Sequence, residues 1–434
     1  MWLKLLGFLL LGYVCIGRSF AYLPSPALKL FVGDLTLGTF LLTHPRATMG
    51  RWFAALLKHN SLSGFAWMLL LFMQYGALEL VRGLSLGYDP LTAAQNLVFN
   101  VYPLFFLIGA WMGARDPAFL PRFIRIQAWC SGLYGLAYIF VLNRLDTSIP
   151  GSNVPWFGQA GGAALALIGL MCFERSLARS WLLILMNAVV MLAVQVRAEW
   201  VSFLVALIIW AVLTGRTGRV LVSLQVIALI LLAGYLADVR LPSPKTRGGE
   251  ISTREIVGRA VAAFDPEWAG ELARNSRFYA GTISFRVTWW KAIWELTHSD
   301  PATALLGQGY GYRLGDLVPY LRNETIRTPH SVFFYALGYT GWIGVVLFVL
   351  YLAAIVRLAW RVFVITGQPF GMAFCAMAIT GALFGNLFET PFGAIPFYLL
   401  AGISAAPALR DASVPVDTLA VCLPSELRRH CQQH

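Results

Sequence analysis

Three residues in the second half of the chain are of the types that bind phosphate and accept a proton. Arg197 lies in QVRAEW, Arg286 lies in SFRVTWWKAIWEL, and His330 lies in TPHSVFFYALGYTGWIG. A guanidinium is a planar fork of N–H donors that binds a phosphate group through two hydrogen bonds and stays charged at neutral pH. A neutral imidazole can act as a general base. The sequence therefore predicts two phosphate-binding residues, Arg197 and Arg286, and one catalytic residue, His330.

Each of these residues also has a purely structural interpretation. An arginine at a helix end can anchor the helix by extending its charged head into the membrane interface. A lone histidine can simply pack. Around Arg286 the aromatic residues recur at helical spacing, which predicts an amphipathic helix in the interface with its tryptophans at headgroup depth and with Arg286 and Lys291 at phosphate level.

The position of His330 predicts its protonation state. Thr328 can cap a helix and Pro329 can be the first helical residue, which would place His330 in the first helical turn. The positive end of the helix dipole disfavours a second positive charge there. We therefore expect a neutral imidazole near pH 7.

The elements that position these residues cross a membrane. Of the 434 residues, 58% are hydrophobic and 12% charged, too little charge for a water-soluble domain. The net charge of +12 is dispersed between apolar blocks, so it does not indicate a nucleic-acid partner. A spanning helix needs about 20 apolar residues. Twelve segments qualify, at about 3–17, 22–43, 63–81, 91–113, 121–142, 158–173, 179–196, 199–214, 220–238, 331–356, 370–388 and 393–408.

The cations predict the orientation of these segments. With the amino terminus inside, the short inner loops carry 12 Lys or Arg and the short outer loops carry 4, which places both termini in the cytoplasm. Residues 1–21 also have a second interpretation, as a signal peptide with Lys4 near its start and Ala21 near the cleavage site. The six cysteines have no CxxC spacing and predict neither a disulfide framework nor a zinc site.

The polar segment 239–329 is predicted to be a large helical loop outside the membrane. Ser252 with Glu255 forms a capping box, and Asp265-Pro266 and Asp300-Pro301 each resemble a helix start. The chain then divides into spans 1–9 (1–238), the loop subdomain (239–329), spans 10–12 (330–408) and a cytoplasmic tail (409–434).

Four other features have no assigned chemistry. The glycines of LLGQGYGY (305–312) predict a plain loop or a flexible turn that approaches substrate. Asp34 is an intramembrane carboxylate, which favours a functional role, but no partner is evident in the sequence. Arg82 and Arg144 face outward away from these motifs, and we expect them to tolerate lysine.

The order of the motifs over about 195–345 resembles the bacterial O-antigen ligase and O-antigen polymerase superfamily. A span opening at Arg197 is followed by the basic inner turn GRTGR (215–219), another span, and a long outer loop. That loop contains an Arg–Trp stretch and LLGQGYGY, and ends in PHS before an aromatic span. Many relatives have Asn after the histidine, whereas this chain has Ser331.

The resemblance implies an all-α integral membrane glycosyltransferase of the GT-C type at the periplasmic face of the bacterial inner membrane. The donor would be a glycan on undecaprenyl diphosphate, transferred en bloc with inversion and without a metal or other cofactor. The acceptor would be the lipid A core in a ligase, or a growing glycan in a polymerase of lipopolysaccharide or exopolysaccharide synthesis. Arg197 and Arg286 would contact the diphosphate and His330 would activate the acceptor hydroxyl. The alternative is a polytopic transporter or flippase of lipid-linked glycan.

Overall fold

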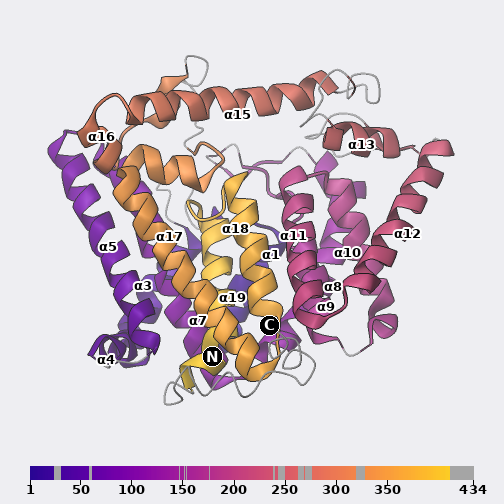
Figure 1. The fold of residues 1–434 in the computed structure, drawn as a ribbon, viewed down its shortest axis with the longest axis horizontal. Helices are drawn as coiled ribbons and strands as arrows, with labels where there is room; N and C mark the ends of the chain where they lie inside the picture. The colour runs from indigo at the N-terminus through magenta and orange to yellow at the C-terminus, as the bar shows by residue number, and fades with distance from the viewer. Residues whose placement is uncertain are drawn as a thin grey trace, which may run out of the picture.

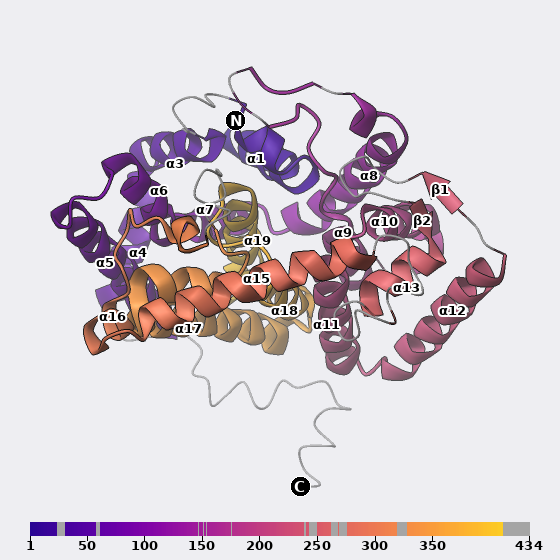
Figure 2. The same cartoon turned by 90° about the horizontal axis from the view of Figure 1, so that it is seen from above.

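A computed structural model describes residues 1–23, 31–57, 61–145, 147–150, 152, 154–174, 176–237, 240–242, 250–261, 268, 276–318 and 328–410. Most of its helices stand side by side, and one long helix, α15 (Ser276–Thr297), lies across one end of them (Figure 1). Seen from that end, α15 crosses above α17 (Val332–Thr366) and α18 (Phe370–Leu383) (Figure 2). The predicted tail beyond Arg410 and the predicted helix start at Asp265-Pro266 lie outside the described residues.

The elements follow the apolar pattern of the sequence. In the first half they are α1 (Trp2–Cys15), α2 (Arg18–Ala21), α3 (Val32–Thr43), η1 (Arg46–Gly50), α4 (Arg51–Leu57), α5 (Ser61–Ser85), α6 (Pro90–Val101), α7 (Leu104–Arg115), α8 (Phe119–Phe140), η2 (Leu142–Arg144), α9 (Ala163–Phe173), η3 (Leu177–Ser180), α10 (Trp181–Val194), α11 (Arg197–Thr214) and α12 (Thr217–Leu236). They continue with β1 (Arg240–Pro242), β2 (Glu250–Ser252), α13 (Thr253–Val261), α15, α16 (Pro301–Leu306), η5 (Leu314–Leu317), α17, α18 and α19 (Pro391–Arg410).

Among the described residues the regular structure is helical apart from one antiparallel pair of strands, in which Arg240 lies opposite Ser252. A helix, or a pair of helices, lies in each of the twelve predicted apolar segments. Five candidate spans in the described part of the chain are long and apolar enough to cross a membrane: 63–85, 90–115, 197–214, 332–366 and 391–409. Five shorter apolar helices accompany them. The all-α class is confirmed, and twelve crossings remain a prediction.

Two predicted caps in the 239–329 segment are present. The Ser252 hydroxyl accepts a hydrogen bond from the amide of Glu255 at 3.2 Å, at the start of α13. The Asp300 carboxylate accepts one from the amide of Thr303 at 2.9 Å, with Pro301 as the first residue of α16. Local sequence was sufficient to locate these helix starts because a capping side chain bonds to an amide only a few residues away.

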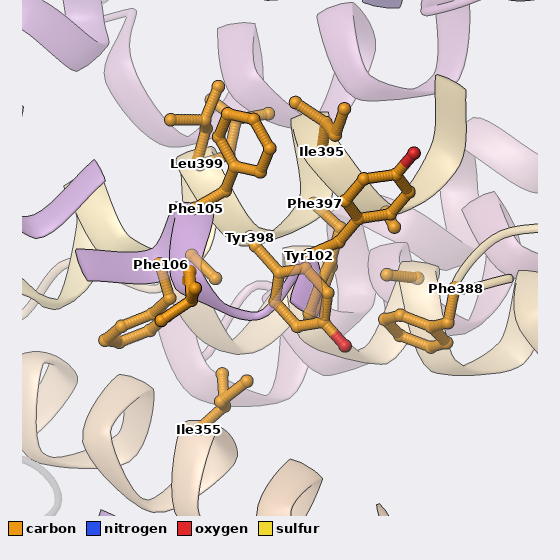
Figure 3. Packing of buried hydrophobic residues seen from close by; sticks show 14 of the residues in the cluster. Tyr102, Phe105, Phe106, Ile355, Phe388, Ile395, Phe397, Tyr398 and Leu399 are labelled. Atoms are coloured by element: carbon orange, nitrogen blue, oxygen red, sulfur yellow. The ribbon is translucent and has the colours of Figure 1, made fainter. Parts of the chain in front are cut away.

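The core is densest where α7 and α19 meet, and Figure 3 shows the aromatic and aliphatic side chains gathered there. Glycines let these helices approach backbone to backbone. A Cβ atom on Gly109 would lie 2.1 Å from the carbonyl oxygen of Leu399, and one on Gly402 would lie 2.1 Å from that of Phe106. Small residues at such crossings give membrane helices their van der Waals attraction. This contact fixes α19, and with it the loop that precedes α19.

Candidate functional site

Helix α15 holds three separate segments of the chain through three side chains on one face. Arg286 Nη1 donates to the carbonyl of Phe384 at 2.8 Å. Trp289 Nε1 donates to the carbonyl of Leu314 at 2.8 Å, and Trp290 Nε1 donates to that of Pro329 at 2.7 Å. Residues three and four apart lie on one helix face, so RVTWW presents all three donors together.

The tryptophans of α15 differ in their exposure. Trp289 is fully buried against the bundle, and Trp294 is 43% exposed, while the predicted depth of this helix at the headgroups stays a prediction. Trp290 is partly buried and its ring stacks on that of Phe334, with centroids 5.2 Å apart and planes 9° apart. Lys291 is exposed and pairs with Glu295 at 3.7 Å. The amphipathic helix is confirmed, but its apolar face packs on the protein.

His330 lies outside the helix that was predicted to contain it. Helix α17 begins at Val332 with Ser331 as its N-cap, so Thr328 and Pro329 do not start the helix. His330 has φ 55°, in the left-handed region that a side chain with a Cβ rarely adopts. The contacts of neighbouring residues must hold this conformation, because it costs on the order of 1–3 kcal/mol.

His330 and Arg286 lie close enough to interact electrostatically. Burial and the positive charge of Arg286 lower the pKa of His330 to about 4. The expected neutral imidazole is therefore present near pH 7, but for a different reason from the predicted helix dipole. Burial also lowers the pKa of Arg286.

In the described part of the chain the Arg286 guanidinium has no carboxylate partner. It donates a hydrogen bond to the neutral carbonyl of Phe384. A partly buried cation with a neutral partner attracts an anion, because desolvation strengthens any charge interaction that it makes. Phe388, fully buried in the core, anchors the loop that supplies this carbonyl.

The same loop contains a carboxyl group that sequence reasoning missed. Glu389 is 6% exposed, and within the part of the chain that the structure describes neither of its carboxyl oxygens has a hydrogen-bond partner. Burial raises its pKa to about 8, although the nearby amides of Leu387 and Phe388 act in the opposite direction. Glu389 is therefore neutral at pH 7. Its signal in the sequence is a single acidic residue between the apolar stretches GALFGNLF and PFGAIPFY.

Arg197 is the first residue of α11, at the end of the bundle where α15 lies. The turn before it is tight, with Gln195 at φ 56°. Helix α11 packs against α18, whose following residue, Phe384, receives the hydrogen bond of Arg286. Arg197 thus begins a helix that packs against α18, and Arg286 bonds to the residue that follows α18.

A mainly apolar cavity of about 360 Å³ lies between these two elements. Ala198 and Glu199, next to Arg197, line one side of it. Gly385 and Asn386, next to Phe384, line another. Residues adjacent to Arg197 and to Phe384 thus border a cavity that is suited to an apolar chain.

The LLGQGYGY segment ends α16 at Leu306 and continues as a loop over 307–312, which packs on α17. Helix α17 is broken at Gly341, where φ is 60° and ψ is −165°. The amides of Gln308 and Gly309 donate to the carbonyls of Gly338 and Tyr339, each at 2.9 Å, just before the break. A Cβ atom on Gly341 would lie 2.4 Å from the backbone of Leu305. The glycines therefore allow this segment to cap the first part of α17, residues 332–340.

Two charged residues outside this site have structural partners. Arg82 donates to the carbonyls of Leu306 and Gly307, each at 2.7 Å, and pairs with Glu79 at 3.1 Å. Arg82 therefore has a structural role, and a lysine there would replace the planar fork that spans these two carbonyls with one compact ammonium. The expectation that Arg82 tolerates lysine stays a prediction. Asp34 accepts hydrogen bonds from the amide of Phe31 and the hydroxyl of Tyr102, each at 3.0 Å. Its role is to cap α3.

The geometry therefore brings Arg286 and His330 together, and Arg197 begins α11, a helix that packs against α18. Comparison with known families adds an independent finding. The family described as O-antigen ligase matches residues 181–349, a region that contains all three residues. No curated protein matches the chain. In this multi-pass membrane protein, residues 181–349 thus match the family described as O-antigen ligase.

Proposed function

We propose that this protein is a glycosyltransferase that moves a glycan en bloc from undecaprenyl diphosphate to a hydroxyl group of an acceptor sugar. The family match supports the class of reaction. The observation that carries the assignment of residues is the pairing of a neutral, half-buried His330 with the Arg286 guanidinium. His330 supplies the base, and Arg286 supplies a positive charge that stabilises the leaving diphosphate.

The reaction needs a base on one side of the anomeric carbon and an anion-binding group on the other. His330 takes the proton of the acceptor hydroxyl as its oxygen bonds to the anomeric carbon. The bond from that carbon to the diphosphate oxygen breaks, and the diphosphate leaves with the electron pair. Arg286 and Arg197 stabilise the negative charge as it develops, an effect worth roughly 3 kcal/mol for one fixed donor. Attack opposite the leaving group inverts the anomeric centre.

The cavity between α11 and α18 fits the lipid part of such a donor. It is lined mainly by apolar atoms from residues such as Phe374, Met377 and Leu400. Residues adjacent to Arg197 and to Phe384 border it. A ligand with a charged head and an apolar chain could place each part in a matching environment. A fully water-soluble sugar nucleotide would leave the cavity unused.

We further propose that α15 and the active site face the periplasm and that the twelve apolar segments cross the inner membrane. The support is the charge bias of the short loops, together with the position of α15 at the end opposite the amino terminus (Figure 1). No cofactor is included in the proposed reaction.

The test is transfer by the purified protein in proteoliposomes, with a lipid-linked glycan as donor. Two acceptors are offered separately, lipid A core and a second lipid-linked glycan. Product with the first identifies a ligase, and product with the second identifies a polymerase. If wild type forms neither product but moves the lipid-linked glycan across the bilayer, the protein is a flippase and the proposal is wrong.

A further inference from the structure

Trp290 connects the proposed base to the helix that carries the proposed phosphate-binding residue. Its indole N–H donates to the carbonyl of Pro329, the residue directly before His330, at 2.7 Å. Its ring stacks on Phe334 in the first turn of α17, with centroids 5.2 Å apart. One side chain therefore contacts the chain on both sides of His330.

His330 needs such support because its backbone is strained. At φ 55° the segment would relax to a commoner conformation if nothing opposed it. On its helical side, the amide of Tyr335 donates to the carbonyl of Ser331 at 2.9 Å and begins α17. On the other side, the hydrogen bond from Trp290 holds Pro329.

The same residue fixes the separation of base and anion-binding group. Arg286 and Trp290 are four residues apart on α15, which is one helical turn, or about 6 Å along the axis. Arg286 is in turn held by the carbonyl of Phe384. Because a helix is rigid over one turn, the two hydrogen bonds set where His330 lies relative to the guanidinium.

We propose that Trp290 is a positioning residue that holds His330 beside Arg286 for attack on the diphosphate-linked sugar. This inference rests on the proposed function. Loss of the indole N–H should release the Pro329 carbonyl and let His330 move toward solvent. A misplacement of about 1 Å in such a site can cost about a hundredfold in rate.

The test compares Trp290→Phe with Trp294→Phe, one turn further along α15. Trp294 is 43% exposed and stacks on His298, so its variant removes an indole without touching Pro329. We expect Trp290→Phe to lower kcat at least tenfold while KM for the lipid-linked donor changes less than twofold. Trp294→Phe should leave kcat within twofold of wild type. Equal kcat values for Trp290→Phe and wild type would overturn the proposal, as would a loss confined to KM.

A second measurement does not depend on activity. In protein with isotope-labelled histidines, NMR titration follows the imidazole of His330, assigned by its absence in His330→Gln. Burial and Arg286 lower its pKa in the wild type. We expect Trp290→Phe to raise that pKa by at least one unit toward 6.5, and Trp294→Phe to leave it unchanged. An unchanged pKa in Trp290→Phe contradicts the positioning role even if no glycan transfer is found for any variant.

If Trp290→Phe fails to fold, 3-benzothienylalanine at position 290 replaces it. This residue keeps the bicyclic ring that stacks on Phe334 and lacks only the N–H donor. The same fall in kcat and the same rise in pKa are expected. Wild-type values for both would show that the ring alone matters, and the proposal would be wrong.

Discussion

The guanidinium of Arg286 lies close enough to the imidazole of His330 to lower its pKa, an effect that adds to that of burial. The two residues are 44 positions apart in the chain and belong to different elements. Burial and this proximity together keep the pKa of His330 at about 4, so the imidazole is neutral at pH 7.

The pH dependence of transfer should reflect this arrangement. Because its pKa is about 4, His330 is in its neutral, active form at pH 5 and becomes protonated as the pH falls further. We expect wild-type transfer to persist at pH 5 and to fall toward pH 4, measured as kcat/KM between pH 3.5 and 8. An inflection near 6.5 would contradict the buried environment of His330.

His330→Gln separates catalysis from packing. Glutamine keeps a polar side chain of similar size but cannot accept a proton at neutral pH. We expect transfer to fall at least a hundredfold while donor binding, measured with a fluorescent lipid diphosphate, stays within twofold. Transfer by His330→Gln at the wild-type rate would remove His330 from the mechanism.

Arg286→Lys should impair transfer at normal protein level. Arg286 uses Nη1 for the carbonyl of Phe384 and has its remaining donors available for an anion, whereas lysine offers one compact ammonium. We expect at least a tenfold loss in kcat/KM. Arg144→Lys is the matched control, since Arg144 is exposed in a short turn, and it should match wild type. Equal activity of both variants would indicate that Arg286 only anchors the loop.

Filling the cavity between α11 and α18 should weaken donor binding. A Cβ on Gly381 would lie 3.8 Å from Ser202, so Gly381→Leu can extend into the cavity without a backbone clash. We expect KM for the lipid-linked donor to rise at least tenfold. A second cavity, of about 430 Å³, is lined by residues of α7, α17, α18 and α19, among them Ser404. Ser404→Leu should leave KM unchanged, and a similar rise in both variants would exclude a specific lipid site.

Glu389→Gln should stabilise the protein in a pH-dependent way. The folded state raises the pKa of Glu389 from 4.5 to about 8, so it binds this proton more tightly than the unfolded chain does. Below pH 4.5 Glu389 is protonated in both states and does not change the free energy of unfolding. As the pH rises to 8 that free energy falls, by on the order of 5 kcal/mol at most. We expect the Tm of Glu389→Gln to exceed that of the wild type increasingly over this range. Glu295→Gln, at an exposed position, should show no such trend.

The orientation can be tested in a variant without the six native cysteines. Cysteine is introduced at Ser299, which lies after α15, or at Gln368, which lies between α17 and α18. Both positions are exposed. We expect a membrane-impermeant thiol reagent to label position 299 in spheroplasts and position 368 only after permeabilisation. The reverse pattern would place the site in the cytoplasm.

The sequence by itself determined the helices and several of their starts. Apolar segments mark their own helices because hydropathy and capping depend on residues close together in the chain. The caps at Ser252 and Asp300 and the shared face of Arg286, Trp289 and Trp290 are of this kind. Hydropathy could not establish the number of crossings, because several of the helices are shorter than a membrane span.

Only the tertiary structure decided the state and position of His330. It lies outside α17, between Pro329 and Phe334, which both contact Trp290 of another helix. The break at Gly341 depends on the backbone of Leu305 packing against it. The depressed pKa needs burial and a charge from another element. Such effects come from residues far apart in sequence, and their energies depend on distances of a few ångströms that no local pattern encodes.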